Sequence, residues 1–305
     1  MRIRLNQTTI IILLVLLGLI FLWFYQTPQS PSSGSVPIQL PSIGPAASAT
    51  PSSPQSPGTP SDNRNLALGN PSDAVHDTGQ PNNYLIERPQ YTLSYNRDHG
   101  IPNWVSWQVT KQDLGNVKRS PTFSPDTSLP KGWYQVTLDD YTGSGYDRGH
   151  MCPSADRTAT AKDNLATFIL TNVLPQAPGN NRSTWEHLEA FARTLVDKGH
   201  TLYITAGGDG KIGMIAKGKV QVPRYTWKII VVMPIGETDP TRITADTPVI
   251  AIRVPNGLKE KLDDWDHYRV TVASIETATG YHFFGNLAPD IQQALKSQVA
   301  PVPSN

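Results

Sequence analysis

The 305-residue chain has a single cysteine, Cys152, and almost no net charge. One cysteine excludes an internal disulfide and argues against a zinc site built from several thiolates. With 26 Lys and Arg against 25 Asp and Glu, the formal charge is +1. A sequence-specific DNA-binding protein is usually far more basic, so that class is disfavoured. A polyanionic partner would have to be held by a small local cluster of cations.

Motifs for nucleotide cofactors and zinc proteases are also missing. The glycine-rich run 206–210 has neither Gly-x-Gly-x-x-Gly nor the Gly-Lys-Ser/Thr of a phosphate-binding loop. We interpret it as a turn and predict no nucleotide cofactor. His187 follows Glu186, but no His-Glu-x-x-His motif is formed. The other histidines apart from His150 show no metal-ligand spacing.

Charged side chains are absent before residue 62, apart from Arg2 and Arg4. Residues 8–25 form an apolar run that would span about 27 Å as a helix, close to the thickness of a bilayer core. The two arginines before it predict a cytoplasmic N-terminus. For residues 1–25 we favour an uncleaved membrane anchor over a cleaved signal peptide, because bulky side chains stand where a signal peptidase needs small ones. Both alternatives stay open, and both export the rest of the chain. No cysteine follows the run, which excludes a lipoprotein.

Residues 26–61 contain nine prolines, many serines and no charged side chain, which predicts a disordered linker. Prolines extend such a segment to about 3.1 Å per residue, so it would reach at most roughly 110 Å. The remaining residues, 62–305, suffice for one globular domain with a sizeable core and nearly balanced charge.

Within residues 62–305, helices interrupt β-rich stretches instead of alternating regularly with strands. That order predicts an α+β fold. The expected strands are 104–109, 133–138, 167–173, 201–206, 225–234 and 247–254. The expected helices are 157–166, 182–198, 258–264 and 289–299.

The segment Asp147-Arg148-Gly149-His150 concentrates chemistry suited to attack on a phosphodiester. His150 carries the side chain whose ordinary pKa is nearest neutrality, so it can take a proton from water. Arg148 offers a planar cationic fork that matches phosphate, and Asp147 can orient a neighbouring group or a metal-bound water. In isolation these four residues would be read as an ordinary turn. Cys152, two residues on, is interpreted as a small buried residue, not a nucleophile.

A second polar set lies in the expected helix that starts near residue 182. Asn181, Glu189 and Arg193 are spaced eight and four residues apart, which places them near one face of a helix. The alternative is an outer polar face with an ordinary i,i+4 pair of Glu and Arg. Arg157, near the histidine, is interpreted as structural, capping or pairing with Asp156.

Together the two segments resemble the DNA/RNA non-specific endonucleases, the ββα-metal or His-Me finger nucleases, and in particular their bacterial sugar-nonspecific branch. The Asp-Arg-Gly-His motif stands at 147–150, Asn-x-x-Pro-Gln at 172–176, and the metal-site pattern at Asn181, Trp185 and Glu189. The resemblance covers nearly everything after about residue 80. It implies a central, mostly antiparallel sheet flanked by helices, with the histidine on a β-hairpin and the asparagine at the following helix.

The resemblance further implies metal-dependent hydrolysis of phosphodiester bonds in DNA and RNA, leaving 5′-phosphates. His150 would be the general base. Asn181 would bind one divalent cation directly, Mg²⁺ or Mn²⁺, and Glu189 would hold its waters. Substrate phosphate would be bound by three arginines, and two polar side chains would support the site: Arg119, Arg148 and Arg193, with Asn172 and Gln176. Some members of this family are blocked by a dedicated inhibitor protein, which makes an inhibitor a candidate partner.

One alternative from another class stays open. The chain would then be an exported, membrane-tethered module that captures nucleic acid for DNA uptake, with little or no catalysis. Such a module would not need a general base, so the intact Asp147–His150 motif favours the nuclease.

Overall fold

The computed structural model describes residues 63–120 and 122–299. The expected anchor or signal segment 1–25 and the linker 26–61 lie outside these residues. Across the part that is described, no helix is both long and apolar enough to cross a membrane. The helices are α2 (Ala161–Ala166), α3 (Trp185–Asp197), α4 (Val272–Thr279) and α5 (Pro289–Ser297). The strands are β1 (Tyr84–Glu87), β2 (Thr92–Asn96), β3 (Ile101–Val109), β4 (Asp147–His150), β5 (Val173–Gln176), β6 (Leu202–Asp209), β7 (Gly213–Ile215), β8 (Val220–Val222), β9 (Tyr225–Val232) and β10 (Val249–Pro255).

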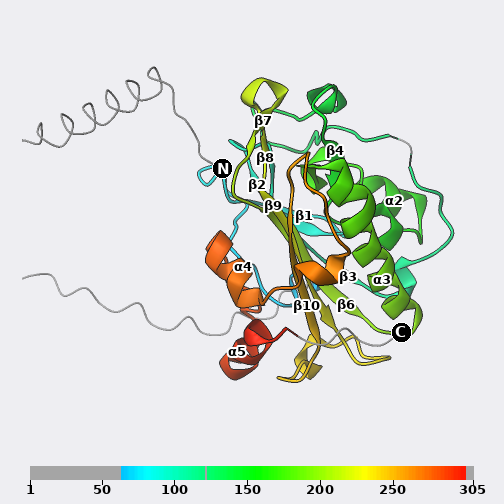
Figure 1. Cartoon of the computed structure of the whole chain (residues 1–305). Coiled ribbons are helices and arrows are strands. Elements are labelled where there is room, and N and C mark those ends of the chain that lie inside the picture. Colours follow the sequence, from blue (N-terminus) through cyan, green and yellow to red (C-terminus); the bar gives the residue numbers. More distant parts are fainter. Residues whose placement is uncertain (1–62, 121, 300–305) are drawn as a thin grey trace, which may run out of the picture. The chain divides into compact units, whose positions relative to one another are not determined.

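A six-stranded sheet forms the centre, in the order β1-β2-β3-β6-β9-β10 (Figure 1). Every neighbouring pair in it is antiparallel. Two short antiparallel ribbons, β4-β5 and β7-β8, complete the strands. The α+β class and the antiparallel sheet flanked by helices are therefore confirmed.

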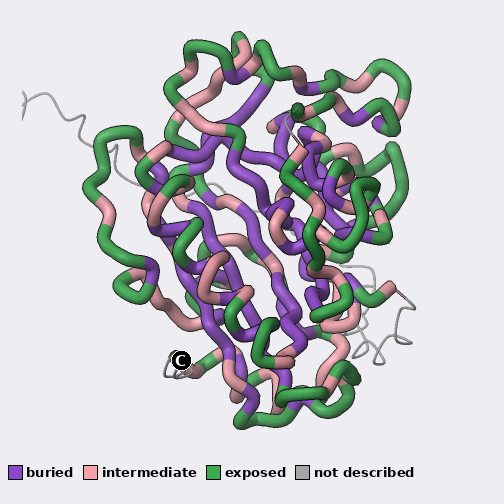
Figure 2. Tube along the Cα trace, turned by 90° about the vertical axis from the view of Figure 1, so that its right-hand side faces the viewer, coloured by how far each residue is buried: buried purple, intermediate pink, exposed green. Residues whose placement is uncertain are grey.

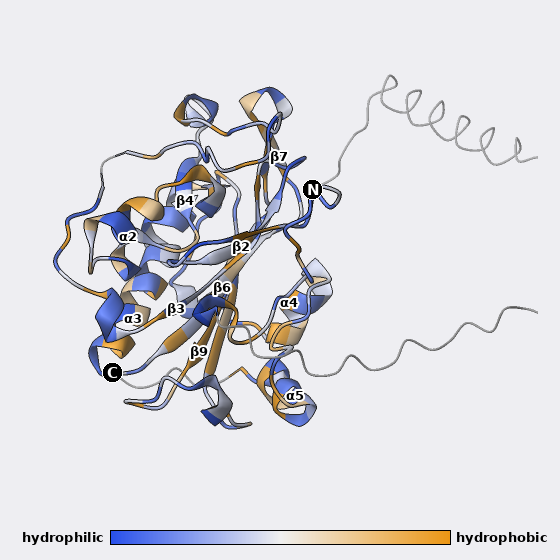
Figure 3. Cartoon of the chain, turned by 180° about the vertical axis from the view of Figure 1, so that it is seen from behind, coloured by the Kyte–Doolittle hydropathy of each residue, from blue (hydrophilic) through white to orange (hydrophobic). Residues whose placement is uncertain are grey.

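Both faces of this sheet are covered, so its central strands are apolar on both sides. In β9, Trp227, Ile229 and Val231 face one core cluster, while Ile230 and Val232 face the other. Helices α4 and α5 pack on the first face, and α3 and the β4-β5 ribbon on the second (Figures 1 and 3). Figure 2 shows the central strands buried along most of their length. The alternation of side chains along a strand explains why one apolar run can supply two cores.

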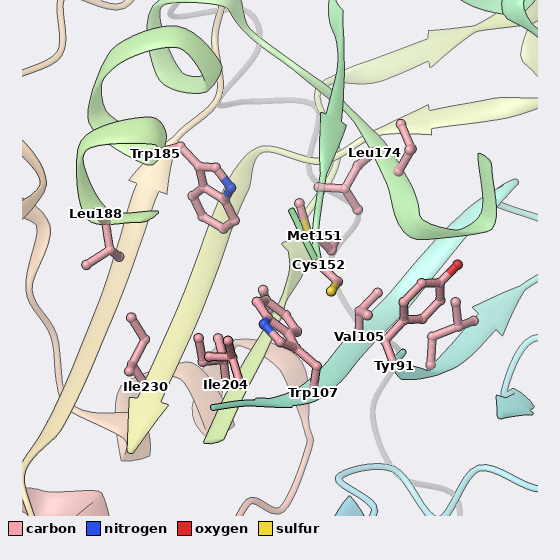
Figure 4. Packing of buried hydrophobic residues seen from close by; sticks show 14 of the residues in the cluster. Tyr91, Val105, Trp107, Met151, Cys152, Leu174, Trp185, Leu188, Ile204 and Ile230 are labelled. Carbon is pink, nitrogen blue, oxygen red and sulfur yellow. The ribbon is translucent and has the colours of Figure 1, made fainter. Parts of the chain in front are cut away.

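Helix α3 carries the predicted apolar stripe: Trp185, Leu188, Ala192 and Leu195 are all buried against the sheet. One π-helical turn, Asn180–Thr184, precedes it. Trp185 lies beside Trp107 of β3, with Met151 and Cys152 in the same cluster (Figure 4). Cys152 is fully buried, as predicted, and burial raises the pKa of its thiol to about 12, so it is not a nucleophile.

Several predicted elements were wrong. Residues 133–138 form irregular chain that ends in a 3₁₀ turn, and no strand; residues 258–264 form an irregular loop and no helix. Residues 167–173 hold a 3₁₀ turn, with β5 starting only at Val173. Helix α2 begins at Ala161, capped by Thr160, and not at residue 157, because Arg157 has a non-helical backbone and a buried guanidinium. The other predicted strands and helices exist, with shifted ends. The expected elements did not include β1, β2, β7, β8 and α4.

Candidate active site

The Asp147–His150 motif is strand β4, which pairs antiparallel with β5. Asp147 stands opposite Gln176, and His150 opposite Val173. Gly149 is required at its position, because a Cβ there would lie 2.2 Å from Oε1 and 2.7 Å from Cβ of Gln176. The predicted histidine on a β-ribbon is thus observed, and the ribbon aligns the two motifs that the sequence separates.

His150 is buried between two phenylalanine rings. The ring centres of Phe123 and Phe168 each lie 4.8 Å from the imidazole centre. A bridge between Ser124 and Ile169 brings these two phenylalanines together. Burial, assisted by the charge of Arg119, lowers the pKa of His150 to about 3, and its Nε2 has no hydrogen-bond partner in the described residues. The low pKa keeps the imidazole neutral at physiological pH, and its Nε2 is buried without a partner.

Two of the predicted arginines lie near His150, and each is placed over one of these two phenylalanine rings. The Arg119 guanidinium lies 5.0 Å from the ring centre of Phe168 and donates from Nη1 to Ser154 Oγ at 2.9 Å. The Arg148 guanidinium lies 5.4 Å from the ring centre of Phe123. Both arginines are exposed to solvent. The surroundings of His150 are therefore cationic and reachable by a phosphate.

Asp147 organises the next part of the site. Its carboxylate accepts a hydrogen bond from Asn181 Nδ2 at 2.9 Å and two from Arg182, at 2.7 and 2.6 Å. Burial alone would raise the pKa of Asp147, but the hydrogen bonds from Arg182 and Asn181 hold it below its usual range. Because Nδ2 of Asn181 must face the carboxylate, Oδ1 points away from it and accepts no hydrogen bond from the described residues.

Glu189 lies in a mostly buried charge cluster between α3 and the sheet. Its Oε1 accepts from Lys228 Nζ at 2.9 Å. Burial raises the pKa of Glu189, although the Lys228 charge opposes that shift. The Arg193 guanidinium approaches Asp156 at 3.6 Å, and Asp156 also accepts from the indole of Trp107 at 3.0 Å. Asn181 and Glu189 are therefore fixed by different partners. The π turn before α3 also interrupts the regular helical spacing that predicted one continuous ridge.

The two predicted supporting residues are both fully buried. Asn172 donates to the carbonyls of Cys152 and Thr167, both at 2.8 Å, and accepts from Cys152 N–H at 3.0 Å. It thus fixes the backbone immediately after His150. Gln176 packs against Gly149, and neither polar atom of its side chain has a hydrogen-bond partner in the described residues.

Several side chains of this region were missed by the sequence reading. They are Phe123, Phe168, Ser154, Arg182 and, as a partner of Glu189, Lys228. Each contacts a residue that is distant in the sequence, so spacing alone did not predict these contacts. Arg157 is structural, as predicted, but its guanidinium binds the carbonyls of Gln90, Gln108 and Asp156 and not the Asp156 carboxylate.

The side chains of the site determine which kind of metal ion they could bind. Within residues 63–120 and 122–299 there is no group of three or more His, Cys, Asp and Glu side chains that could hold a metal. A neutral, outward-facing amide oxygen at Asn181 fits a hard divalent cation that keeps most of its water shell. The residues present therefore fit a hydrated Mg²⁺ or Mn²⁺, and not a zinc cage.

Comparison with known proteins agrees with this geometry. The family model for DNA/RNA non-specific endonucleases matches residues 68–290. A nuclease from Nostoc sp. is 50% identical over 241 residues, covering 79% of this chain and 88% of its own. Nuclease C1 of Cunninghamella echinulata is 33% identical, covering 71% and 89%. The crystal structure of the EndoG/EndoGI complex superimposes with a TM-score of 0.61 at 26% identity, over 74% of this chain and 91% of that one. The chain belongs to the DNA/RNA non-specific endonucleases.

Proposed function

We propose that this enzyme hydrolyses phosphodiester bonds in both DNA and RNA to 5′-phosphate products, with His150 as the general base. The observation that carries the proposal is the unpartnered Nε2 of His150, beside two exposed arginines. A general base must be unprotonated at the working pH and must lie within reach of its water. Its position between Arg119 and Arg148 supports phosphate binding beside it.

Asn181 would hold a divalent cation, Mg²⁺ or Mn²⁺, directly through Oδ1, and Glu189 would hold it through water. Such an ion supplies charge neutralisation at the scissile phosphate and at the leaving 3′ oxygen. Asp147 keeps the Asn181 amide in the orientation that exposes Oδ1.

The arginines supply the remaining positive charge. The transition state of phosphodiester hydrolysis carries more negative charge than the substrate, so fixed cations lower its energy. Arg119 is held by Ser154 and Phe168, which limits its motion before substrate binds. Arg193, on α3, is 23% exposed and lies 3.6 Å from the Asp156 carboxylate. We assign phosphate binding to Arg119, Arg148 and Arg193.

The test is cleavage of supercoiled plasmid by the full chain in Mg²⁺, in Mn²⁺ and in EDTA. His150→Ala should lose cleavage by several orders of magnitude and keep DNA binding. The matched control is His187→Ala, which changes an exposed histidine on α3 beside Asp264. Wild-type protein that retards plasmid on a gel but cleaves in no metal would instead support the binding module for DNA uptake.

Asn181 is tested separately by metal titration. Asn181→Ala should raise the Mg²⁺ concentration needed for half-maximal cleavage. An unchanged titration would remove Asn181 as the ligand.

Export of the catalytic domain, by a membrane anchor or a cleaved signal at 1–25, stays part of this proposal. Inhibition by a dedicated inhibitor protein is also part of the proposal. The structural similarity to the EndoG/EndoGI complex supports it.

A further inference from the structure

A cavity of about 600 Å³ opens between two short 3₁₀ turns, Leu138–Tyr141 and Ala216–Gly218. Both turns lie at the same end of the sheet as β4 (Figure 1). The cavity lining includes Tyr134, Asp139 and Ser144 on the first side and Ile215, Lys217 and Lys219 on the second. Its volume is in the range of pockets that accept a small organic ligand, which includes one nucleotide unit.

An exposed aromatic ring on the first side of the cavity faces two lysines on the second side. Tyr134 is 38% exposed, which is unusual for a large apolar ring. The ammonium of Lys219 lies 5.7 Å from the centre of this ring. Neither Lys217 nor Lys219 has an ion-pair partner among the residues described. An aromatic face beside uncompensated cations is the combination that binds a base together with its phosphate.

The side that carries Tyr134 is also acidic, and this fixes the direction in which a nucleotide can lie. Tyr134 donates its hydroxyl hydrogen to Asp140 at 2.7 Å, and Asp140 also caps the turn at Thr137. The ring of Tyr134 is therefore held in place before any ligand binds. Asp139 lines the same side. Carboxylates repel phosphate but accept hydrogen bonds from the amino groups of bases, so the phosphate must lie toward the lysines.

The lysine side is held in a conformation that side chains rarely adopt. Ala216 and Lys217 are consecutive non-glycine residues with φ of 53° each. Left-handed backbone at two such residues is strained and is retained where the position of a side chain matters. Here it sets Lys217 at the rim of the cavity.

The cavity is close to the cleavage site along the chain and in space. Ser144 precedes His150 by six residues, a separation of at most about 20 Å. The β7-β8 hairpin, which carries both lysines at its turn, contacts β5, the partner of β4. A strand with one phosphate at His150 could therefore place a nucleotide a few positions further along in the cavity.

We propose that this cavity is a subsite for one unpaired nucleotide of the substrate, with its base stacked on Tyr134 and its phosphate held by Lys217 and Lys219. The proposal rests on the proposed nuclease function. Stacking on Tyr134 requires a free base face, which a single strand offers and an intact duplex does not. The subsite therefore favours single-stranded DNA or RNA over duplex.

The test is equilibrium binding of a labelled 12-nucleotide single strand and of the matching duplex to the full chain in EDTA. Tyr134→Ala should weaken single-strand binding about tenfold and change duplex binding far less. Tyr134→Phe keeps the ring and should recover the binding that Tyr134→Ala loses. Lys219→Ala should reduce the salt dependence of single-strand binding by about 0.7 in the logarithmic slope. Lys111→Ala, at an exposed lysine paired with Asp197, is the matched control and should leave that slope unchanged.

Equal binding of the single strand by wild type and Tyr134→Ala would overturn the subsite, and so would an equal loss for strand and duplex. Failure of the proposed function looks different. In that case wild type would cleave no substrate in Mg²⁺ or Mn²⁺, while Tyr134→Ala would still weaken single-strand binding in EDTA.

Discussion

The ammonium of Lys228 lies 2.9 Å from the carboxylate of Glu189, and both side chains are largely out of contact with water. Lys228 is 1% exposed and also stands 4.2 Å from the ring centre of Trp185 and 5.7 Å from that of Trp107. Each charge offsets much of the desolvation of the other. Lys228 therefore does two things: it keeps Glu189 in place and it makes burial of that carboxylate tolerable.

Removing one partner should destabilise the fold strongly. Lys228→Met would leave the Glu189 carboxylate buried without its cation, at an expected loss of about 3–5 kcal/mol in unfolding free energy. Urea denaturation followed by circular dichroism measures this loss. The double variant Lys228→Met/Glu189→Leu removes both charges and should recover most of the stability, but not cleavage.

The matched control for that experiment is an exposed ion pair. Lys111 and Asp197 lie 2.6 Å apart, but their side chains are 65% and 60% exposed. Lys111→Met should therefore change the unfolding free energy by less than about 1 kcal/mol. A Lys228→Met variant no less stable than Lys111→Met would refute the buried-pair argument.

A second prediction concerns the contact between β4 and β5. Gly149→Ala would place a methyl group within 2.7 Å of two atoms of Gln176, so the ribbon must shift. We expect a loss of about 1–3 kcal/mol in stability. Cleavage should fall by more than the stability loss explains, because His150 adjoins the shifted residue. Gly213→Ala in β7 is the control, since a Cβ there meets nothing within 4 Å. Thermal melts and plasmid cleavage at a temperature where both variants stay folded separate the two effects.

The parts of this fold that could be predicted are those in which local pattern decides the structure. The apolar stripe of α3 can be buried together only on one face of a helix, so this helix was predicted correctly. The stripe consists of Trp185, Leu188, Ala192 and Leu195. The apolar run of β9 supplies side chains to both core clusters, and it was predicted as a strand on the same kind of pattern. The candidate site residues were predicted because Asp147–His150 and Asn181 stand in a recognisable order.

The rest depends on contacts between distant residues. Residues 258–264 have a helix-like composition. Their backbone is instead committed to other segments: Thr184 donates to the Asp263 carbonyl, and Leu258 packs near Gly145. A lysine such as Lys228 is not expected in a buried central strand. It is tolerated there because it pairs with Glu189, 39 positions away in the sequence. Nothing within a short window of sequence encodes such pairings.

A third prediction follows from the hydrogen bond between Asp147 and Asn181. Asp147→Ala removes the group that orients the Asn181 amide, so Oδ1 is no longer fixed outward. We expect the Mg²⁺ concentration for half-maximal cleavage to rise about 10- to 100-fold, the usual effect of losing a partner that orients a metal ligand. Arg182→Ala is the control: it removes the exposed partner of Asp147 but leaves Asn181 bonded, so its effect should be smaller. Equal Mg²⁺ dependence in wild type and Asp147→Ala would contradict this role.

The last prediction concerns acid stability and the burial of His150. Burial lowers the pKa of this imidazole to about 3 in the folded protein, against an ordinary value near 6.5 in an unfolded chain. Between those pH values the unfolded chain binds a proton that the folded chain does not. Stability contributed by neutral His150 is therefore fully present above about pH 6.5 and is lost as pH falls toward 3. At pH 4.5 the loss should reach about 2–3 kcal/mol.

Unfolding free energies of wild type and His150→Gln, measured from pH 7.5 to 4.5, isolate this contribution, because every other titrating group is shared. Wild type should lose about 2–3 kcal/mol more than His150→Gln over that range. His187→Gln, at an exposed position on α3, should follow wild type.

The same burial predicts that kcat/KM shows no acid limb from His150 near pH 6.5, because the free enzyme already holds this base unprotonated. Parallel stability curves for wild type and His150→Gln, with an imidazole that titrates near pH 6.5 by NMR, would mean that burial does not set the basicity of His150.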